Sequence, residues 1–317
     1  MAVAVVAKET SGQAEPNWRD KLRAWWHGDD YVMRHMIQDY STQPVQHVAE
    51  TAPEAPAETP TIERWTPRRQ QVVQRLFGDG FNQPGGEELM KTLTQPLGLN
   101  PNMSVTELGC GLGGMTRMMA RDGMWVDAYE PDADLALSAT EIARSQGLRQ
   151  RTNIKNMALD DLSLKRKSVD IVLSKEGLMS VQDKRLLLAK LRAAMKPGGQ
   201  LMLTGFLLTG PTDSRVYEVW WEREPVKPHL LTPEALQAEL ESLNFVICYI
   251  EDVSHELKEA VINAFSGYDR DLKLLGKNIN ENEREWVISE GEHWAIRISA
   301  MDANIIRLYR IYCRVVD

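Results

Sequence analysis

A run of glycines between two acidic residues is the part of this sequence best suited to chemistry. The loop Gly109–Gly114 follows the apolar segment MSVTEL and precedes MTRMMARDG, which has a helical pattern. Such a loop at the end of a strand lets the backbone approach a ligand closely, and the amides of the next helix point at that ligand. Glu107 precedes the loop, and Glu130 ends the next apolar segment, WVDAYE. We therefore expect a binding site here.

Two classes of cofactor use a glycine loop of this form. Gly109, Gly111 and Gly114 satisfy GxGxxG, the dinucleotide fingerprint. Glu107, Gly109, Gly111 and Gly113 satisfy the acidic-x-Gly-x-Gly-x-Gly pattern of enzymes that use S-adenosylmethionine (SAM). The glycines alone leave both classes open.

The acidic residues favour SAM. A carboxylate at Glu107 can bind the methionine ammonium of SAM, whereas it would repel a pyrophosphate. Glu130 stands 19 residues beyond Gly111, where an acid can accept hydrogen bonds from both ribose hydroxyls in either class. No Tyr-x-x-x-Lys constellation for hydride transfer is present. An NAD(P)-linked oxidoreductase stays as the alternative.

A turn further along the chain points to a family. Lys196-Pro197-Gly198-Gly199 leads into the strand pattern QLMLTGFLL, and it resembles the turn before the fifth strand of class I SAM-dependent methyltransferases. The order and spacing of the glycine loop, Glu130 and this turn match that family over roughly residues 100 to 250. The resemblance implies an enzyme that methylates a small organic or lipid-derived acceptor.

The segment before the glycine loop has a narrower resemblance. RLFGDGFNQPGG at residues 75–86 is similar to the segment that covers the cofactor in phosphoethanolamine N-methyltransferases and related small-molecule methyltransferases. By this resemblance Gln83, Gly85 and Gly86 would lie against SAM. Ser174, at the end of the fourth expected strand, belongs to the expected cofactor set. Ala158 stands where the usual acid after the third strand would be, so Asp160 or else Asp161 is expected to take its role.

The chain departs from that narrower group where the substrate would bind. Gln83 and Pro84 replace two hydroxyl residues, and Ser180 stands where the active-site His is expected. Val226 and Pro228 occupy positions of phosphate-contacting residues. Phosphoethanolamine is therefore a poor substrate candidate, and a non-catalytic SAM-binding protein of the same fold is a second alternative.

The acceptor side of the site is expected in two loops, because ligands of open α/β sheets bind at the carboxyl ends of the strands. Glu176, after the fourth strand, is a candidate for direct contact with the substrate, and His229, in the insertion after the fifth strand, is a candidate base. Trp220 and Trp221 in the same insertion could stack on a flat or cationic acceptor or simply pack.

Alternating strand and helix periods from about residue 62 predict an α/β fold, a doubly wound Rossmann-like sheet of the class I methyltransferase type with helical insertions. Expected strands are 103–108, 125–129, 153–157, 169–174, 200–207, 245–251 and 305–315, the last of them antiparallel. Expected helices are 66–77, 86–94, 114–122, 132–146, 182–195, 233–243, 254–276 and 281–301.

The first 61 residues are expected to stand apart from this domain of residues 62–317. Residues 41–61 are rich in Pro, Ala, Thr and Glu, which is typical of a solvated linker. Apolar residues at helical spacing within 17–40 predict two short amphipathic helices, which could pack on the main domain or dock to a partner or a second copy.

The amino-acid composition limits the classes of partner that we expect this protein to bind. The chain has 317 residues, and 37 basic against 45 acidic side chains give a net charge of −8, which argues against nucleic acid. Its three cysteines form no CxxC pair, so we expect no disulfide framework and no metal site, and a cytoplasmic location fits. No stretch is long and apolar enough to predict a membrane span.

Overall fold

The computed structural model describes residues 65–275 and 281–316, without the side chains of 269–275 and 281–282. The expected N-terminal helices, the linker and the domain boundary near residue 62 lie outside the described residues.

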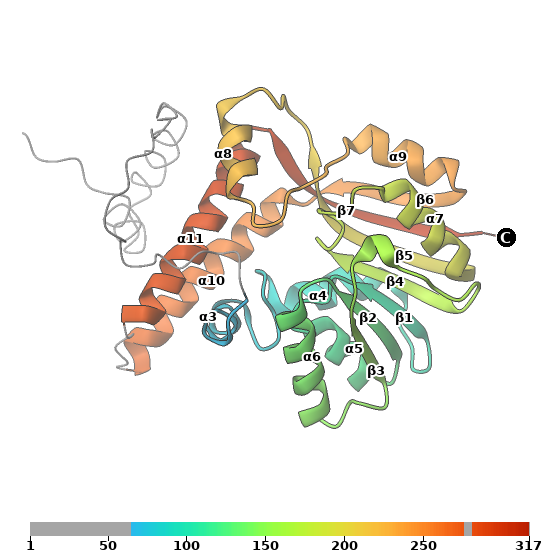
Figure 1. The fold of residues 1–317 in the computed structure, drawn as a ribbon, viewed down its shortest axis with the longest axis horizontal. Coiled ribbons are helices and arrows are strands. Elements are labelled where there is room, and N and C mark those ends of the chain that lie inside the picture. Colours follow the sequence, from blue (N-terminus) through green and yellow to red (C-terminus); the bar gives the residue numbers. More distant parts are fainter. Residues whose placement is uncertain (1–64, 276–280, 317) are drawn as a thin grey trace, which may run out of the picture. The chain divides into compact units, whose positions relative to one another are not determined.

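A seven-stranded sheet forms the centre of the described domain (Figure 1). Its spatial order is β3-β2-β1-β4-β5-β7-β6, with β1 to β5 parallel and β7 antiparallel to both of its neighbours. The strands are β1 Ser104–Leu108, β2 Trp125–Glu130, β3 Thr152–Asn156, β4 Val169–Lys175, β5 Met195–Leu208, β6 Phe245–Asp252 and β7 Ile306–Val315. This confirms the predicted doubly wound sheet with an antiparallel last strand.

Helices cover both faces of the sheet, as the alternating pattern predicts. The helices α5 Gly114–Arg121 and α6 Ala133–Ser145 pack on β2 and β3, while α4 Gly86–Thr94 packs on α5. Side chains of α7 Lys184–Ala194 and α9 Pro233–Ser242 join the sheet in one apolar core that includes Leu188, Leu201 and Leu240. A parallel sheet buried on both faces needs such a core on each side.

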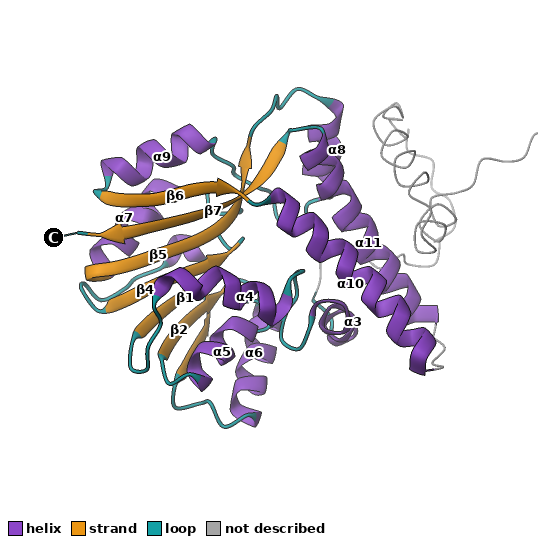
Figure 2. Cartoon of the chain, turned by 180° about the vertical axis from the view of Figure 1, so that it is seen from behind, coloured by secondary structure: helices purple, strands orange, loops and turns teal. Residues whose placement is uncertain are grey.

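Four further helices gather at one end of the sheet (Figure 2). They are α3 Pro67–Phe77, α8 Arg215–Arg223, α10 Ser254–Leu275 and α11 Glu281–Asp302. The α11 helix contacts α3, α8, α10 and β7. Three of them, α3, α10 and α11, match the expected helices 66–77, 254–276 and 281–301, whereas the α8 segment carried no helix prediction.

Local sequence explains where several helices begin. Thr66 and Thr232 each cap a helix that starts with proline, and their hydroxyls accept hydrogen bonds from the third helical amide, at 3.2 Å in both cases. Ser214 caps α8 in the same way, accepting from the amide of Tyr217 at 3.2 Å. This Ser cap is the local signal that could have predicted α8.

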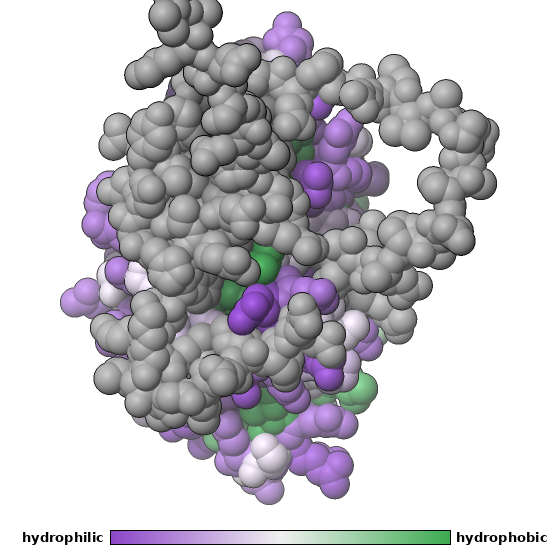
Figure 3. Space-filling model, turned by 90° about the vertical axis from the view of Figure 1, so that its left-hand side faces the viewer, coloured by the Kyte–Doolittle hydropathy of each residue, from purple (hydrophilic) through white to green (hydrophobic). Residues whose placement is uncertain are grey.

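Exposed hydrophobic residues are scattered over the described surface. Trp125, Leu137, Leu186, Val246 and Ile262 are each about half exposed and lie on five different elements. On the face shown in Figure 3, the described residues in view are mixed in hydropathy, with a small hydrophobic group near the bottom. Within residues 65–275 and 281–316, no helix has the length and hydrophobicity that crossing a bilayer requires.

Candidate functional site

A cavity of about 360 Å³ opens where β1, β2 and β4 end. Its walls come from the loop after β1, the last residue of β2, the residues that follow β4, and segments before α4, after α8 and within α11. The strand order reverses direction between β1 and β4, and open α/β sheets bind their ligands at such a point.

The glycines of the loop allow backbone and side chains to meet at very short range. A Cβ atom on Gly109 would lie 2.7 Å from the Cα of Gly177 in the loop after β4. A Cβ atom on Gly111 would lie 2.1 Å from Oδ1 of Asn82. Both glycines also have positive φ, 71° and 57°, which side-chain-bearing residues rarely adopt. Glycine is therefore required at position 109, where backbone would be met, and strongly favoured at position 111.

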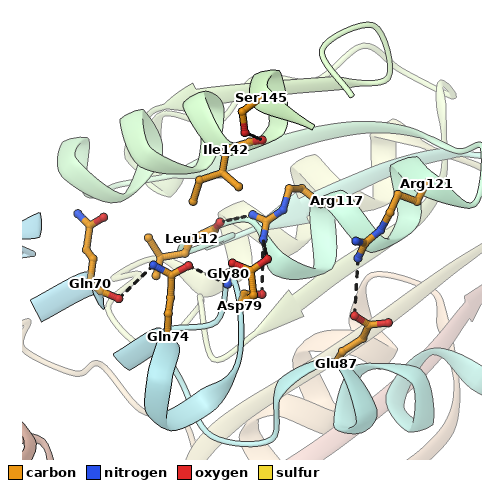
Figure 4. A network of polar contacts seen from close by, with 10 residues as sticks. All are labelled: Gln70, Gln74, Asp79, Gly80, Glu87, Leu112, Arg117, Arg121, Ile142 and Ser145. Atoms are coloured by element: carbon orange, nitrogen blue, oxygen red, sulfur yellow. Dashed lines mark hydrogen bonds and ion pairs between the residues drawn. The ribbon is translucent and has the colours of Figure 1, made fainter. Parts of the chain in front are cut away.

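A polar network fixes the segment that covers the loop (Figure 4). The buried guanidinium of Arg117, on α5, donates to the carbonyl of Leu112 at 2.7 Å and lies 3.5 Å from a carboxylate oxygen of Asp79. The amide of Gly80 donates to Gln74 Oε1 at 2.9 Å, and the Gly80 carbonyl accepts from the amide of Gly114 at 2.9 Å. This network connects α3, the covering segment and α5.

Glu130 lies in the cavity wall and also supports the glycine loop. One carboxylate oxygen accepts from the amide of Gly111 at 2.7 Å, and the other accepts from the amide of Asp132 at 3.0 Å. Each oxygen keeps a further lone pair for a ligand. Burial raises the pKa of Glu130 to about 7, although the two amides oppose this shift.

Glu107 is the second buried acid of the cavity wall. Its carboxylate accepts a hydrogen bond from the hydroxyl of Thr116 on α5. Burial raises the pKa of Glu107 to about 8, and the negative charge of Glu130 adds to the rise. Burial disfavours the negative charge of both acids, and a nearby positive charge would compensate for this. This half of the cavity is therefore suited to a cationic ligand.

Glu176 lies at the opposite half of the cavity, directly after β4. Its backbone adopts φ 58°, uncommon for a residue with a side chain, and its amide donates to the carbonyl of Thr204 at 2.8 Å. Its side chain is only 2% exposed, and Lys175 Nζ and Arg297 Nη1 each lie 3.9 Å from one of its oxygens. A buried acid is therefore placed between two cations in the cavity wall.

Arg297, on α11, joins this half of the cavity to the insertion after β5. Its Nε and Nη2 donate to the two carboxylate oxygens of Glu224, each at 2.7 Å, and Trp220 Nε1 donates to Glu224 at 2.7 Å. The positive charge of Arg297 is neutralised by the buried carboxylate of Glu224. Burial alone would raise the pKa of Glu224, but the nearby Arg297 outweighs burial and lowers it.

The structure brings half of the predicted site residues together. Those that line the cavity are Glu107, Gly109, Gly111, Glu130, Gln83 and Glu176. Ser180 and Val226, which stand at the substrate positions of the resembled group, line it as well. The remaining predicted residues do not line the cavity.

Four of those remaining residues shape the backbone around the site. Gly113 and Gly85 are the left-handed N-caps of α5 and α4, with φ of 74° and 103°. A Cβ on Gly86 would lie 2.7 Å from the carbonyl oxygen of Phe77. Ser174 is buried, and its hydroxyl donates to the carbonyl of Leu108 at 2.8 Å, which joins β4 to β1.

Asp160 and His229 are placed away from the cavity. Asp160 is exposed in a short 3₁₀ helix, and its carbonyl accepts a hydrogen bond from Lys190 Nζ at 2.7 Å. The side chain of His229 is exposed, while its backbone binds Met179 and Lys184. Neither side chain is positioned to contact a ligand in this cavity.

The structure does not place the two tryptophans where the expected stacking role would need them. Trp220 is 1% exposed and packs edge-on against Tyr217, and Trp221 lies under the ammonium of Lys227 at 4.3 Å. Neither tryptophan lines the cavity. The packing alternative therefore applies to Trp220, whereas Trp221 is partly exposed and its ring contacts only the ammonium of Lys227 among the contacts described above.

Some cavity residues carried no sequence prediction. Asn82 and Gly177 directly adjoin the predicted residues Gln83 and Glu176, so their position in the sequence was a signal that could have identified them. Arg297 and Glu224 come from α11 and the end of α8, far from any motif. Only the tertiary packing of α11 on α8 brings them to the site.

The comparisons with known proteins agree with this geometry. The methyltransferase domain family matches residues 82–250, more than half of the chain. Phosphoethanolamine N-methyltransferase 3 of Arabidopsis thaliana is 21% identical over 227 residues, covering 72% of this chain and 46% of that protein. A 2-methyl-6-phytyl-1,4-hydroquinone methyltransferase of Synechocystis is 31% identical over 137 residues, covering 42% of this chain and 40% of that protein. The chain spans less than half the length of these curated relatives.

Solved structures show the same fold. The Haemonchus contortus phosphoethanolamine N-methyltransferase 2 in complex with SAM aligns with a TM-score of 0.69 at 17% identity, over 78% of this chain and 57% of that one. A geranyl diphosphate methyltransferase in complex with geranyl diphosphate and sinefungin aligns with a TM-score of 0.56 at 15% identity, over 79% and 100% of the two chains. With the strand order and the glycine loop already described, the family match establishes that this chain belongs to the methyltransferase domain family.

Proposed function

We propose that this protein transfers a methyl group from SAM to a small organic or lipid-derived acceptor. The observation that carries the proposal is the pair of buried carboxylates, Glu107 and Glu130, on either side of the glycine loop at the strand ends. Burial disfavours the negative charges of both acids, as their raised pKa values show, and a cationic ligand beside them would favour the charged forms.

The residues present fit SAM. The free lone pairs of Glu130 can accept the ribose hydroxyls, and Glu107 can face the methionine ammonium. Gly109 and Gly111 leave room for the ligand to approach the backbone. When bound, SAM supplies an electrophilic methyl group, and the protein has to hold the acceptor atom in line with it at about 3 to 3.5 Å.

Phosphoethanolamine is not the acceptor that we propose, although several relatives act on it. Val226 lines the cavity where a phosphate-contacting residue is expected. Lys227 beside it is turned away, because its ammonium donates to the carbonyl of Trp221 at 3.0 Å and lies over that ring. The two cations of the cavity wall, Lys175 and Arg297, already face the carboxylates of Glu176 and Glu224. A phosphate dianion would have to compete with these carboxylates for them, and without paired cations it would lose more on desolvation than it regains.

A cytoplasmic location is part of the same proposal. All three cysteines are unpaired, and Cys110 and Cys313 are buried. This supports a reducing compartment.

A transfer assay with methyl-labelled SAM tests the proposed function. The purified protein is incubated with a panel of phenols, hydroquinones, prenylated quinols, amines and phosphoethanolamine, and the products are separated by mass. We expect label in at least one aromatic or lipid-derived acceptor and negligible label in phosphoethanolamine. Robust labelling of phosphoethanolamine would overturn the acceptor proposal, and SAM binding without turnover of any acceptor would favour the non-catalytic alternative.

A further inference from the structure

One polar group in the cavity wall takes no part in the proposed contacts with SAM. The carboxylate of Glu176 is 2% exposed, and its Oε1 is fully buried without a hydrogen-bond partner among the described residues. A buried carboxylate oxygen that accepts no hydrogen bond is costly in a folded protein. Glu176 lines the cavity at the end of β4, so a donor on the bound acceptor can hydrogen-bond to this carboxylate.

The two cations beside Glu176 are held in place by other groups. Lys175 Nζ donates to Gln83 Oε1 and to the carbonyl of Pro84, each at 3.0 Å. Arg297 uses Nε and Nη2 for Glu224 and directs Nη1 toward Glu176 at 3.9 Å. Both cations therefore stay near the carboxylate whether or not it is charged.

This arrangement suits the removal of a proton from a hydroxyl group. When Glu176 takes the proton, it becomes neutral and the negative charge moves to the acceptor oxygen. Lys175 and Arg297 can then stabilise that oxyanion, because they no longer face a charged Glu176. An amine acceptor would instead become a cation on methylation, and the same two positive charges would oppose it.

We propose that the acceptor is a weakly acidic hydroxyl compound, a phenol, hydroquinone or enol, and that Glu176 is its general base. The inference rests on the proposed function. The O–H bond breaks and its proton passes to Glu176, while the oxygen's electron pair forms the new bond to the methyl carbon. The pair of the methyl–sulfur bond stays on sulfur, so S-adenosylhomocysteine leaves, and Glu176 later returns the proton to solvent.

The test compares Glu176→Gln with the wild type on two phenols, one neutral at the assay pH and one already ionised, such as a dinitrophenol. Glutamine keeps the size of the side chain but cannot accept the proton. Turnover of the neutral phenol should fall by about 10²- to 10⁴-fold, the usual contribution of a general base. Turnover of the ionised phenol should fall far less, because no proton has to be removed.

Matched measurements separate this inference from the proposed function. SAM affinity of Glu176→Gln, measured by calorimetry, should equal that of the wild type. Glu222→Gln, an exposed residue of α8, is the control and should leave both turnovers unchanged. An equal loss for both phenols, no loss, or a wild type that methylates only amines would overturn the role of Glu176 and leave the proposed function standing. Absence of SAM binding by the wild type would instead reject the proposed function.

Discussion

Glu107 and Glu130 each combine a structural contact with an open position toward the cavity. Glu130 orders the glycine loop through the amide of Gly111, and Glu107 accepts from Thr116 on the helix that follows the loop. The same carboxylates therefore set the shape of the loop and the charge of the pocket. Because both are buried, their ionisation couples ligand binding to pH.

The pH dependence has a defined sign. Burial raises the pKa of Glu107 to about 8 and that of Glu130 to about 7. Both values lie above the value of about 4.3 for an unfolded Glu, so the ligand-free protein should lose stability as pH rises from about 4.3 to 8. SAM should bind the ionised acids, so its affinity should increase from pH 6 to 7.5.

Thermal unfolding with and without SAM measures both effects together. The increase in melting temperature on adding SAM should be larger at pH 7.5 than at pH 6, and calorimetry in two buffers should detect proton release on binding. Glu107→Gln should reduce this dependence, since glutamine can still accept from Thr116 but does not titrate. A pH-independent SAM shift in the wild type would contradict the assignment of these acids to the SAM site.

At the scale of elements, the loops after β1 and β4 must pass each other closely. A Cβ on Gly177 would lie 2.4 Å from the carbonyl oxygen of Leu108, and one on Gly109 would lie 2.7 Å from Gly177 itself. This contact brings the loop that carries Glu176 beside the glycine loop. The spacing between the two halves of the cavity depends on it.

Gly177→Ala should therefore destabilise the protein by about 1 to 3 kcal/mol, the usual effect of overpacking. It should also weaken SAM binding, because either loop has to shift. Gly205→Ala, in β5, is the matched control, as a Cβ there has nothing within 4 Å. Chemical denaturation measures the difference, and equal midpoints for the two variants would contradict the close packing of these loops.

The pairing of α11 with the insertion after β5 depends on a buried ion pair. Arg297→Met should lower the free energy of unfolding by about 3 to 5 kcal/mol, because it leaves the negative charge of Glu224 buried without its cation. The exposed pair of Arg215 with Glu218 provides the control, and Arg215→Met should change stability by about 0.5 kcal/mol or less. Similar denaturation midpoints for the two variants would show that Glu224 is not buried in solution.

At the scale of the whole molecule, the sequence predicts the sheet because its signals are local. Each strand and most helices have their own apolar period and caps, and the order of elements then leaves few topologies. Glu130 was predicted for the same reason, as its distance from the glycine loop follows from one strand, one helix and one further strand.

The acceptor half of the site could not be predicted in the same way. Arg297 has no motif around it and reaches the cavity only because α11 packs on α8. Conversely, His229, Trp220 and Trp221 are residue types that suit catalysis or stacking, yet none of them lines the cavity, because two lie on α8 and one in the loop after it. Residue type indicates what chemistry is available, and packing decides where it is used.

Calorimetric titration of SAM into the wild type, Glu130→Ala and Glu141→Ala tests the central claim most directly. We expect SAM to bind the wild type, NADH not to compete, and Glu130→Ala to bind SAM more weakly by about 1.5 to 3 kcal/mol, the range for hydrogen bonds to a charged group. Glu141→Ala, an exposed acid on α6, should match the wild type. Equal SAM affinity for wild type and Glu130→Ala, or binding of NADH in place of SAM, would contradict the account.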